Sequence, residues 1–88
     1  MTTEEKLIQF IKDNNLSFKE GQRNTNTTIL CGYALFIGAS IQDCKESIPT
    51  KMSTGQLNAE IERVYNYADD NNYGKWWEKP EAAKMYKF

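Results

Sequence analysis

The sequence predicts an all-α fold, a small bundle of four to five short helices, and three observations support this prediction. Apolar residues recur at helical spacing in separate segments, without a convincing strand-like alternation. Polar stretches that contain helix-capping residues separate these segments. The chain has 88 residues, of which 40% are hydrophobic and 26% are charged, so it is suited to one hydrophobic core rather than two. We therefore expect a single helical domain over residues 1–88.

The first helix is expected to begin at a capping box. Thr2 and Glu5 are three residues apart, and their hydroxyl and carboxylate can satisfy two backbone N–H groups that lack helical partners. The apolar residues that follow repeat at helical spacing: Leu7, Ile8, Phe10 and Ile11. This pattern predicts about three turns of helix, ending near Asn14 and Asn15. An extended connection follows, with two apolar anchors, Leu16 and Phe18.

The second helix carries the broadest apolar stripe and should lie at the centre of the bundle. In the connection before it, Gly21 permits a positive φ at little cost. Asn24 or Asn26 is expected to cap this helix, and Gly38 is a natural left-handed end. Its apolar stripe consists of Ile29, Leu30, Tyr33, Ala34, Phe36 and Ile37.

Two further helices follow. Ser40 with Asp43 forms a second capping-box pattern, and Pro49 ends this short third helix, whose apolar residues are Ile41, Cys44 and Ile48. Ser53 or Thr54 can cap the fourth helix, which should fray within residues 69–72. The apolar positions of the fourth helix are Leu57, Ile61, Val64, Tyr65 and Ala68.

The C-terminal tail, residues 73–88, differs from the rest of the chain in being rich in aromatic residues. Pro80 stands at a plausible first position of a short fifth helix that folds back, with at least one of Trp76 and Trp77 packed as a lid. Core or lid packing is one interpretation of this pair. The other is base stacking, because Lys75 places a cation beside flat aromatic faces.

Charge and composition limit the function classes. Eleven basic and twelve acidic residues give a net charge of −1, so attraction to nucleic acid or to an anionic membrane would need a local patch. Residues 1–6 lack the features of a secretory signal, and no apolar run is long enough for a membrane span. We expect a cytoplasmic protein. Cys31 and Cys44 are expected to be buried free thiols rather than zinc ligands.

Catalytic chemistry finds little support in the sequence. The chain contains no histidine, its glycines do not form either familiar phosphate-cradling loop, and its acidic residues are scattered over helix surfaces. We therefore expect no catalytic residue, no metal site and no cofactor. The function to look for is binding.

Three stretches together resemble a known family. They are Glu-Gly-Gln-Arg-Asn at residues 20–24, a helix that begins Thr-Thr-Ile-Leu at residues 27–30 and ends at Gly38, and Leu-Asn-Ala-Glu-Ile at residues 57–61, which leads to Tyr65. This arrangement is similar to the small C-terminal helical (PriCT-like) domain of archaeo-eukaryotic-type primases and primase-polymerases of plasmids, phages and mobile elements. The similarity covers about residues 16–77.

The resemblance implies an accessory role in DNA replication. Such domains follow the catalytic domain and help to hold single-stranded template or the initiating nucleotide, while catalysis belongs to the other domain. The implied partners are single-stranded DNA or a nucleotide, and the catalytic primase or helicase domain of the same or another chain. The candidate nucleic-acid or phosphate-binding residues are Lys19, Gly21, Gln22, Arg23, Asn24, Lys75 and Trp76.

The connection before the second helix has physical features that suit phosphate. An arginine near a helix N-terminus combines a planar five-donor fork with backbone amides and the positive end of the helix dipole. Arg23 therefore has two interpretations, a ligand contact or a structural brace that bonds carbonyls or Glu60 on the fourth helix, and both can hold. A different class of function also remains open: a protein-interaction module, or a small phage or mobile-element regulator, that binds a partner through the aromatic tail.

Overall fold

The part of the chain that the structure describes consists of four α-helices and their connections. The computed structural model describes residues 2–19, 21–49 and 55–73, and within these ranges it contains no strand. The helices are α1 (Thr3–Asp13), α2 (Arg23–Ile37), α3 (Ile41–Ser47) and α4 (Gly55–Asp70). The predicted all-α bundle is thus confirmed. The expected fifth helix and the cap candidates Ser53 and Thr54 lie outside the described residues.

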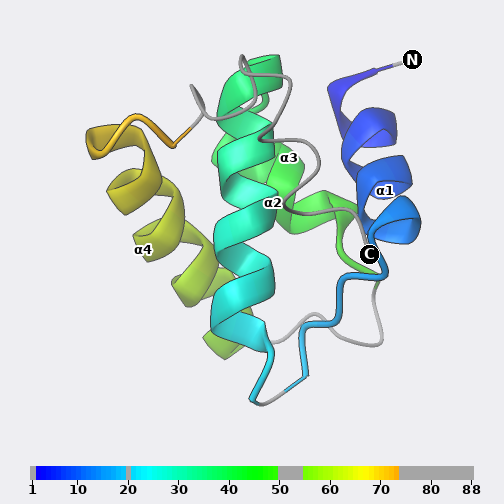
Figure 1. Cartoon of the computed structure of the whole chain (residues 1–88), viewed down its shortest axis with the longest axis horizontal. Helices are drawn as coiled ribbons and strands as arrows, with labels where there is room; N and C mark the ends of the chain where they lie inside the picture. The colour runs from blue at the N-terminus through cyan, green and yellow to red at the C-terminus, as the bar shows by residue number, and fades with distance from the viewer. Residues whose placement is uncertain (1, 20, 50–54, 74–88) are drawn as a thin grey trace.

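Helix α2 is the central element. It contacts each of the other three helices and packs most extensively against α4, while α1 packs mainly against α3. Figure 1 shows α2 between α1 and α4, with α3 behind it. Pairing therefore joins helices that are not neighbours in the sequence, and this arrangement brings the end of α1 close to the start of α2.

Two helices begin at the capping boxes that the sequence predicts. At α1, the Glu5 N–H donates to the Thr2 hydroxyl (3.1 Å) and the Thr2 N–H donates to the Glu5 carboxylate (3.2 Å). The capping box of α3 has the same form. The Asp43 N–H donates to the Ser40 hydroxyl and the Ser40 N–H donates to the Asp43 carboxylate, each at 3.1 Å. These local bonds fix where α1 and α3 start.

A single hydrophobic core contains most of the residues that the helical patterns select. The predicted residues that are buried are Leu7, Phe10, Ile11, Leu16, Phe18, Ile29, Leu30, Ala34, Cys44, Ile48, Leu57, Ile61, Val64 and Ala68. Cys31 and Thr27 are also buried, although neither belongs to the predicted stripe of α2. Tyr65 is half-buried and packs against the core.

Phe36 is a correction to the predicted stripe of α2, because 45% of its surface is exposed. Thr27 and Cys31 define the face of α2 that is buried most deeply. Phe36 lies nine positions after Thr27, which at about 100° per residue places it roughly opposite that face. The predicted stripe was therefore too broad for the surface that the neighbouring helices cover.

The start of α2 also differs from the sequence prediction, and the proposed caps Asn24 and Asn26 are wrong. The helix begins at Arg23, and the N-cap position is taken by Gln22, whose side chain makes no capping hydrogen bond to the residues described. Gly21, at φ 92°, reverses the chain early, so both asparagines lie inside the first turns. At the other end, Gly38 ends α2 in the predicted left-handed conformation, with φ 79°.

Candidate functional site

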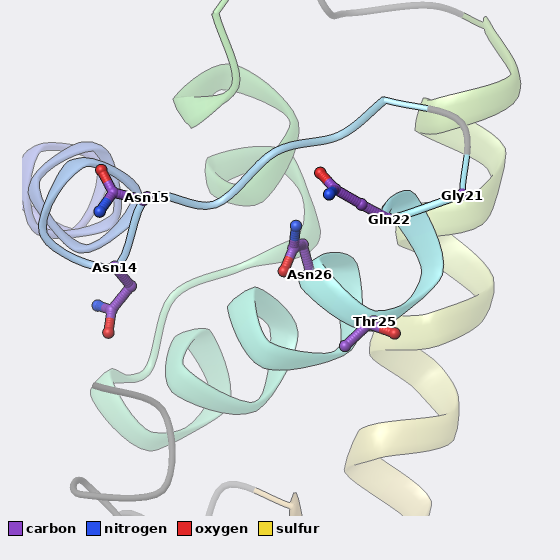
Figure 2. Close-up of a pocket in the computed structure, with 6 residues that line it drawn as sticks. All are labelled: Asn14, Asn15, Gly21, Gln22, Thr25 and Asn26. Atoms are coloured by element: carbon purple, nitrogen blue, oxygen red, sulfur yellow. The ribbon is translucent and has the colours of Figure 1, made fainter. Parts of the chain in front are cut away.

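A pocket of about 350 Å³ lies where α1 ends and α2 begins. Figure 2 shows the described residues that line it: Asn14, Asn15, Gly21, Gln22, Thr25 and Asn26. Two come from the end of α1, and the others come from the turn and the first turns of α2. This pocket is the natural place to look for a ligand because it contains part of the predicted binding stretch.

Local bonding fixes the wall that α1 contributes. Asn14 is the C-cap residue of α1, and its side-chain N–H donates to the Phe10 carbonyl at 2.9 Å. Asn15 takes a left-handed conformation at φ 52°, which asparagine tolerates better than most residues. The chain then turns into the connection whose anchors, Leu16 and Phe18, are buried. The apolar anchors thus hold the two amides at the rim of the pocket.

The opposite wall comes from α2. Figure 2 shows the side chains of Gln22 and Asn26 projecting into the space between this helix and the connecting chain. The Asn26 side-chain N–H donates to the Ser17 carbonyl at 2.5 Å, which ties α2 to the connection. The Gln22 side chain, at the N-cap position, makes no capping hydrogen bond to the described residues. It therefore does not accept a hydrogen bond from the backbone N–H groups in the first turn of α2.

The described residues that line the pocket are polar and uncharged. Each amide side chain carries both hydrogen-bond donors and an acceptor, and Thr25 adds a hydroxyl. The start of α2 contributes the positive end of a helix dipole, and its first turn holds no acidic residue. Such a surface can match the donor and acceptor edge of a base, with an anionic group nearby.

Arg23 is not among these lining residues and pairs instead with Glu60 of α4. Its Nε lies 2.6 Å from Oε2 of Glu60, although the two groups are not aligned as a hydrogen bond. The Arg23 side chain is 31% exposed, whereas the Glu60 side chain is only 9% exposed. The structure therefore contains the bracing contact with Glu60 that the sequence offered as one of two alternatives, and a ligand contact by Arg23 stays a prediction.

Glu60 serves a second guanidinium group. Arg63 Nη2, from the next turn of α4, lies 3.6 Å from Oε1, so each carboxylate oxygen of Glu60 faces a different arginine. Thr27 lies on the same face of α2, one turn after Arg23 and one turn before Cys31. Both of these neighbours contact α4: Arg23 contacts Glu60, and the Cys31 thiol donates to the Ile61 carbonyl at 3.9 Å. The Thr27 hydroxyl is fully buried and has no hydrogen-bond partner among the described residues.

The predicted site residues lie in different surroundings in the structure. Gly21 and Gln22 line the pocket, whereas Arg23 faces α4. Lys19 is exposed just before the turn, and its carbonyl accepts from the Gln22 N–H at 3.0 Å. Asn24 is exposed, and its carbonyl accepts from the Thr28 hydroxyl at 2.9 Å. The tail candidates lie outside the described residues: Lys75 and Trp76, with the neighbouring Trp77.

Four lining residues were not recognised as site residues in the sequence: Asn14, Asn15, Thr25 and Asn26. The sequence pattern marks the first two only as a helix end, and Asn26 only as a cap candidate. A usable signal was present, because amide side chains are dense on both sides of the buried connection. Two amide-rich segments joined by an anchored loop can converge on one polar surface.

The remaining chemistry lies in the core. The prediction of buried free thiols is confirmed for Cys31 and Cys44. A hydrogen bond with Cys44, together with burial, raises the pKa of the Cys31 thiol far above its usual range. In the part of the chain that the structure describes, no three His, Cys, Asp or Glu side chains gather as metal ligands would. No helix described here has the length and apolar character needed to cross a membrane.

No protein-family model, curated protein or solved structure matches this chain. The pocket and the charged cluster around Glu60 are therefore the features from which a function can be argued.

Proposed function

We propose that this chain is a non-catalytic accessory helical domain of a primase-like DNA replication protein, and that it helps to hold single-stranded template or an initiating nucleotide in the cytoplasm. The observation that carries the proposal is the pocket at the junction of α1 and α2. Gly21 and Gln22, from the Gly-Gln-Arg-Asn stretch, line it together with four further polar residues. The partner domain would be the catalytic primase or helicase domain of the same or another chain.

The pocket suits one nucleotide unit rather than a long duplex. Amide side chains from Asn15, Gln22 and Asn26 supply donors and acceptors for a base edge. Lys19 and the start of α2, where the Gln22 side chain makes no capping bond to the described residues, lie beside them and favour the neighbouring phosphate. Because these contacts are few and the protein carries a net charge of −1, binding is expected to be weak and to weaken further as salt rises.

An NMR titration of the isotope-labelled protein tests the proposal. Short single-stranded DNA and a nucleoside triphosphate would be added separately, at low and at moderate salt. We expect amide shifts centred on the pocket residues, with the shifts reduced at the higher salt concentration. Gln22→Ala should abolish most of this response. Gln42→Ala is the matched control, because it removes an exposed amide from α3. Unchanged pocket signals at high ligand concentration would refute the proposal.

A protein-interaction module, or a small phage or mobile-element regulator, is the second candidate, and one observation favours it. Tyr73, the first residue of the aromatic tail, packs edge-on against Tyr67 of α4, with ring centroids 5.8 Å apart. Tyr67 nevertheless remains 58% exposed. Tyr67 and Tyr73 therefore form an aromatic pair at the end of α4, and exposed aromatic side chains are common where proteins dock.

Fluorescence separates this candidate from the first, since the two tryptophans of the chain, Trp76 and Trp77, both lie in the tail. A partner that docks on the tail should shield them at any salt concentration. Single-stranded DNA that binds only at the pocket should leave their emission unchanged. Shielding by protein partners alone, without pocket shifts in the NMR titration, would favour the interaction module.

A further inference from the structure

Among the residues that the structure describes, the charges around Glu60 do not balance, and this imbalance lies next to the proposed ligand site. Arg23 and Arg63 each approach one oxygen of the same carboxylate, at 2.6 Å and 3.6 Å. Two positive charges thus meet one negative charge, which leaves one positive charge in excess. Arg23 belongs to the first turn of α2, where the sequence provides no acidic residue to absorb that charge.

We propose that Glu60 holds Arg23 in reserve and releases it to a phosphate group bound at the start of α2, while Arg63 keeps Glu60 paired. The inference rests on the proposed function and adds to it a regulation of the same site. Glu60 is then an internal competitor of the ligand and acts through Arg23 as a positioning residue. The partner chemistry is a phosphate of a nucleotide or of a single strand.

The contact between Arg23 and Glu60 has the character of an exchangeable pair. The two atoms are close, yet they lack hydrogen-bond alignment. A phosphate offers Arg23 aligned, charge-assisted hydrogen bonds, often two at once. The Nε atom that faces Glu60 is itself buried, but 31% of the Arg23 side chain is exposed, so part of this side chain already meets solvent. The side chain can therefore exchange one anion for another by rotating outward.

Arg63 can remain as the counter-ion of Glu60 when Arg23 leaves. The Glu60 side chain is 9% exposed, and a buried carboxylate without a counter-ion is strongly unfavourable. Arg63 already lies 3.6 Å from its second oxygen and is 72% exposed, so it can move closer when Arg23 leaves. The buried Thr27 hydroxyl, on the same face of α2 as Arg23, is a further candidate donor to the carboxylate.

Binding of a short thymidine oligonucleotide to a set of variants tests this inference. Glu60→Gln removes the competing anion at nearly constant shape, so it should tighten binding about three- to tenfold. Arg63→Gln should weaken binding, because Glu60 then holds Arg23 more firmly. In the Glu60→Gln background the same Arg63→Gln change should have little effect. Lys6→Gln is the control for a general loss of charge, because Lys6 is exposed near the far end of α1.

The guanidinium N–H signals of the two arginines give a direct readout in the unmodified protein. On addition of the oligonucleotide, the Arg23 Nε–H signal should shift together with the pocket amides. The Nη–H groups of Arg63, which face Glu60, should become better protected from solvent exchange as this pairing tightens. A purely structural brace would leave both signals in place.

The outcomes are distinguishable. If the unmodified protein binds and Glu60→Gln binds equally or more weakly, the inference is wrong and the proposed function stands. An equal effect of Arg63→Gln in both backgrounds would likewise overturn it. If neither the unmodified protein nor Glu60→Gln binds, the proposed function and this inference both fail. Should Glu60→Gln not fold, an unmoved Arg23 signal beside shifted pocket amides would decide against the inference.

Discussion

Tyr65 joins α4 to the turn between α2 and α3 through one side-chain bond. Its hydroxyl donates to the Ala39 carbonyl at 2.6 Å, and Ala39 is buried. Burial raises the pKa of Tyr65 above its ordinary value, and the neighbouring Cys44 thiol and Asp69 carboxylate act in the same direction. The hydroxyl is thus kept in the neutral form, which can donate this bond.

Tyr65→Phe should lower the free energy of unfolding by about 1 kcal/mol, because the Ala39 carbonyl loses its partner while the ring packing is kept. Urea denaturation followed by circular dichroism measures the change. Tyr67→Phe is the control, since its ring is exposed and its contact with Tyr73 does not need the hydroxyl. Equal effects of the two substitutions would contradict this account of Tyr65.

Asp43 links two helices through its carboxylate. It completes the capping box of α3 and also accepts a hydrogen bond from the Thr3 hydroxyl of α1 at 3.0 Å. The hydrogen bond from the Ser40 backbone N–H lowers the pKa of Asp43 below its ordinary 3.8, and the bond from the Thr3 hydroxyl lowers it further. The stabilisation is therefore present above that ordinary value and is lost as the pH falls through the lower, folded-state value.

We expect acid to weaken the native protein less steeply in Asp43→Asn than in the unmodified protein. The thermal midpoint would be recorded from about pH 6 to about pH 2, where carboxylates titrate. At neutral pH the variant should already be less stable, since it has lost the ionised cap. Asp70→Asn, at the exposed end of α4, serves as the comparison. A variant that repeats the unmodified acid profile would show that Asp43 contributes nothing to it.

Among the elements, α2 depends on a backbone conformation at its C-terminus. Gly38 has φ 79°, and its N–H approaches the carbonyls of Ala34 and Leu35. A Cβ atom added at this position would meet no other atom within 4 Å. The requirement for glycine is therefore conformational rather than steric, and it belongs to the turn that leads into α3.

Gly38→Ala should destabilise the protein by about 1 kcal/mol, the typical cost of a left-handed conformation for a residue with a Cβ atom. Gly55→Ala, at the start of α4, provides a sharp contrast. A Cβ atom there also meets nothing within 4 Å, and the residue does not have a positive φ. Chemical denaturation of both variants should show a loss at position 38 and no loss at position 55. A comparable loss at both positions would point to packing instead.

The elements that local chemistry determines could be predicted from the sequence. The capping boxes at Thr2 and Ser40 involve residues three apart, so their bonds form whatever the rest of the chain does. The start of α2 could not be predicted in this way. It depends on the φ of Gly21 and on Asn26, whose side chain is engaged by the Ser17 carbonyl across the connection.

The candidate site was only partly predictable for a related reason. Gly21 and Gln22 were selected as neighbours of an arginine, and they do line the pocket. Asn14 and Asn15 join them only because the bundle brings the end of α1 against the start of α2. The contact between Arg23 and Glu60 was anticipated as one alternative, but no sequence pattern states that Glu60 is buried or that Arg63 shares it.

At the scale of the whole molecule, the two cysteines lie among α2, α3 and α4. Cys31 belongs to α2 and Cys44 to α3, both are fully buried, and the Cys31 thiol also contacts the Ile61 carbonyl of α4. A cysteine attacks a disulfide reagent as its thiolate, and the raised pKa of Cys31 disfavours that form. Reaction therefore requires the helices to separate.

Both thiols should resist a disulfide reagent in the native protein and react at a rate that rises with urea as the bundle opens. Colorimetric thiol labelling at increasing urea concentrations measures this rate. Asn66→Cys adds an exposed thiol on α4 and should react at once. Rapid labelling of Cys31 or Cys44, independent of urea, would contradict the packing described here.

The pairing of helices has a consequence for how the chain can be divided. The residues up to Pro49 form α1, α2 and α3, and these helices contact one another. Helix α4 begins at Gly55 and packs mainly against α2. Two pieces severed between Pro49 and Gly55 would each present half of one complementary apolar surface. Their reassembly in a mixture would turn this fold into a two-fragment system, in which the fourth helix is a detachable component whose affinity for the rest can be measured.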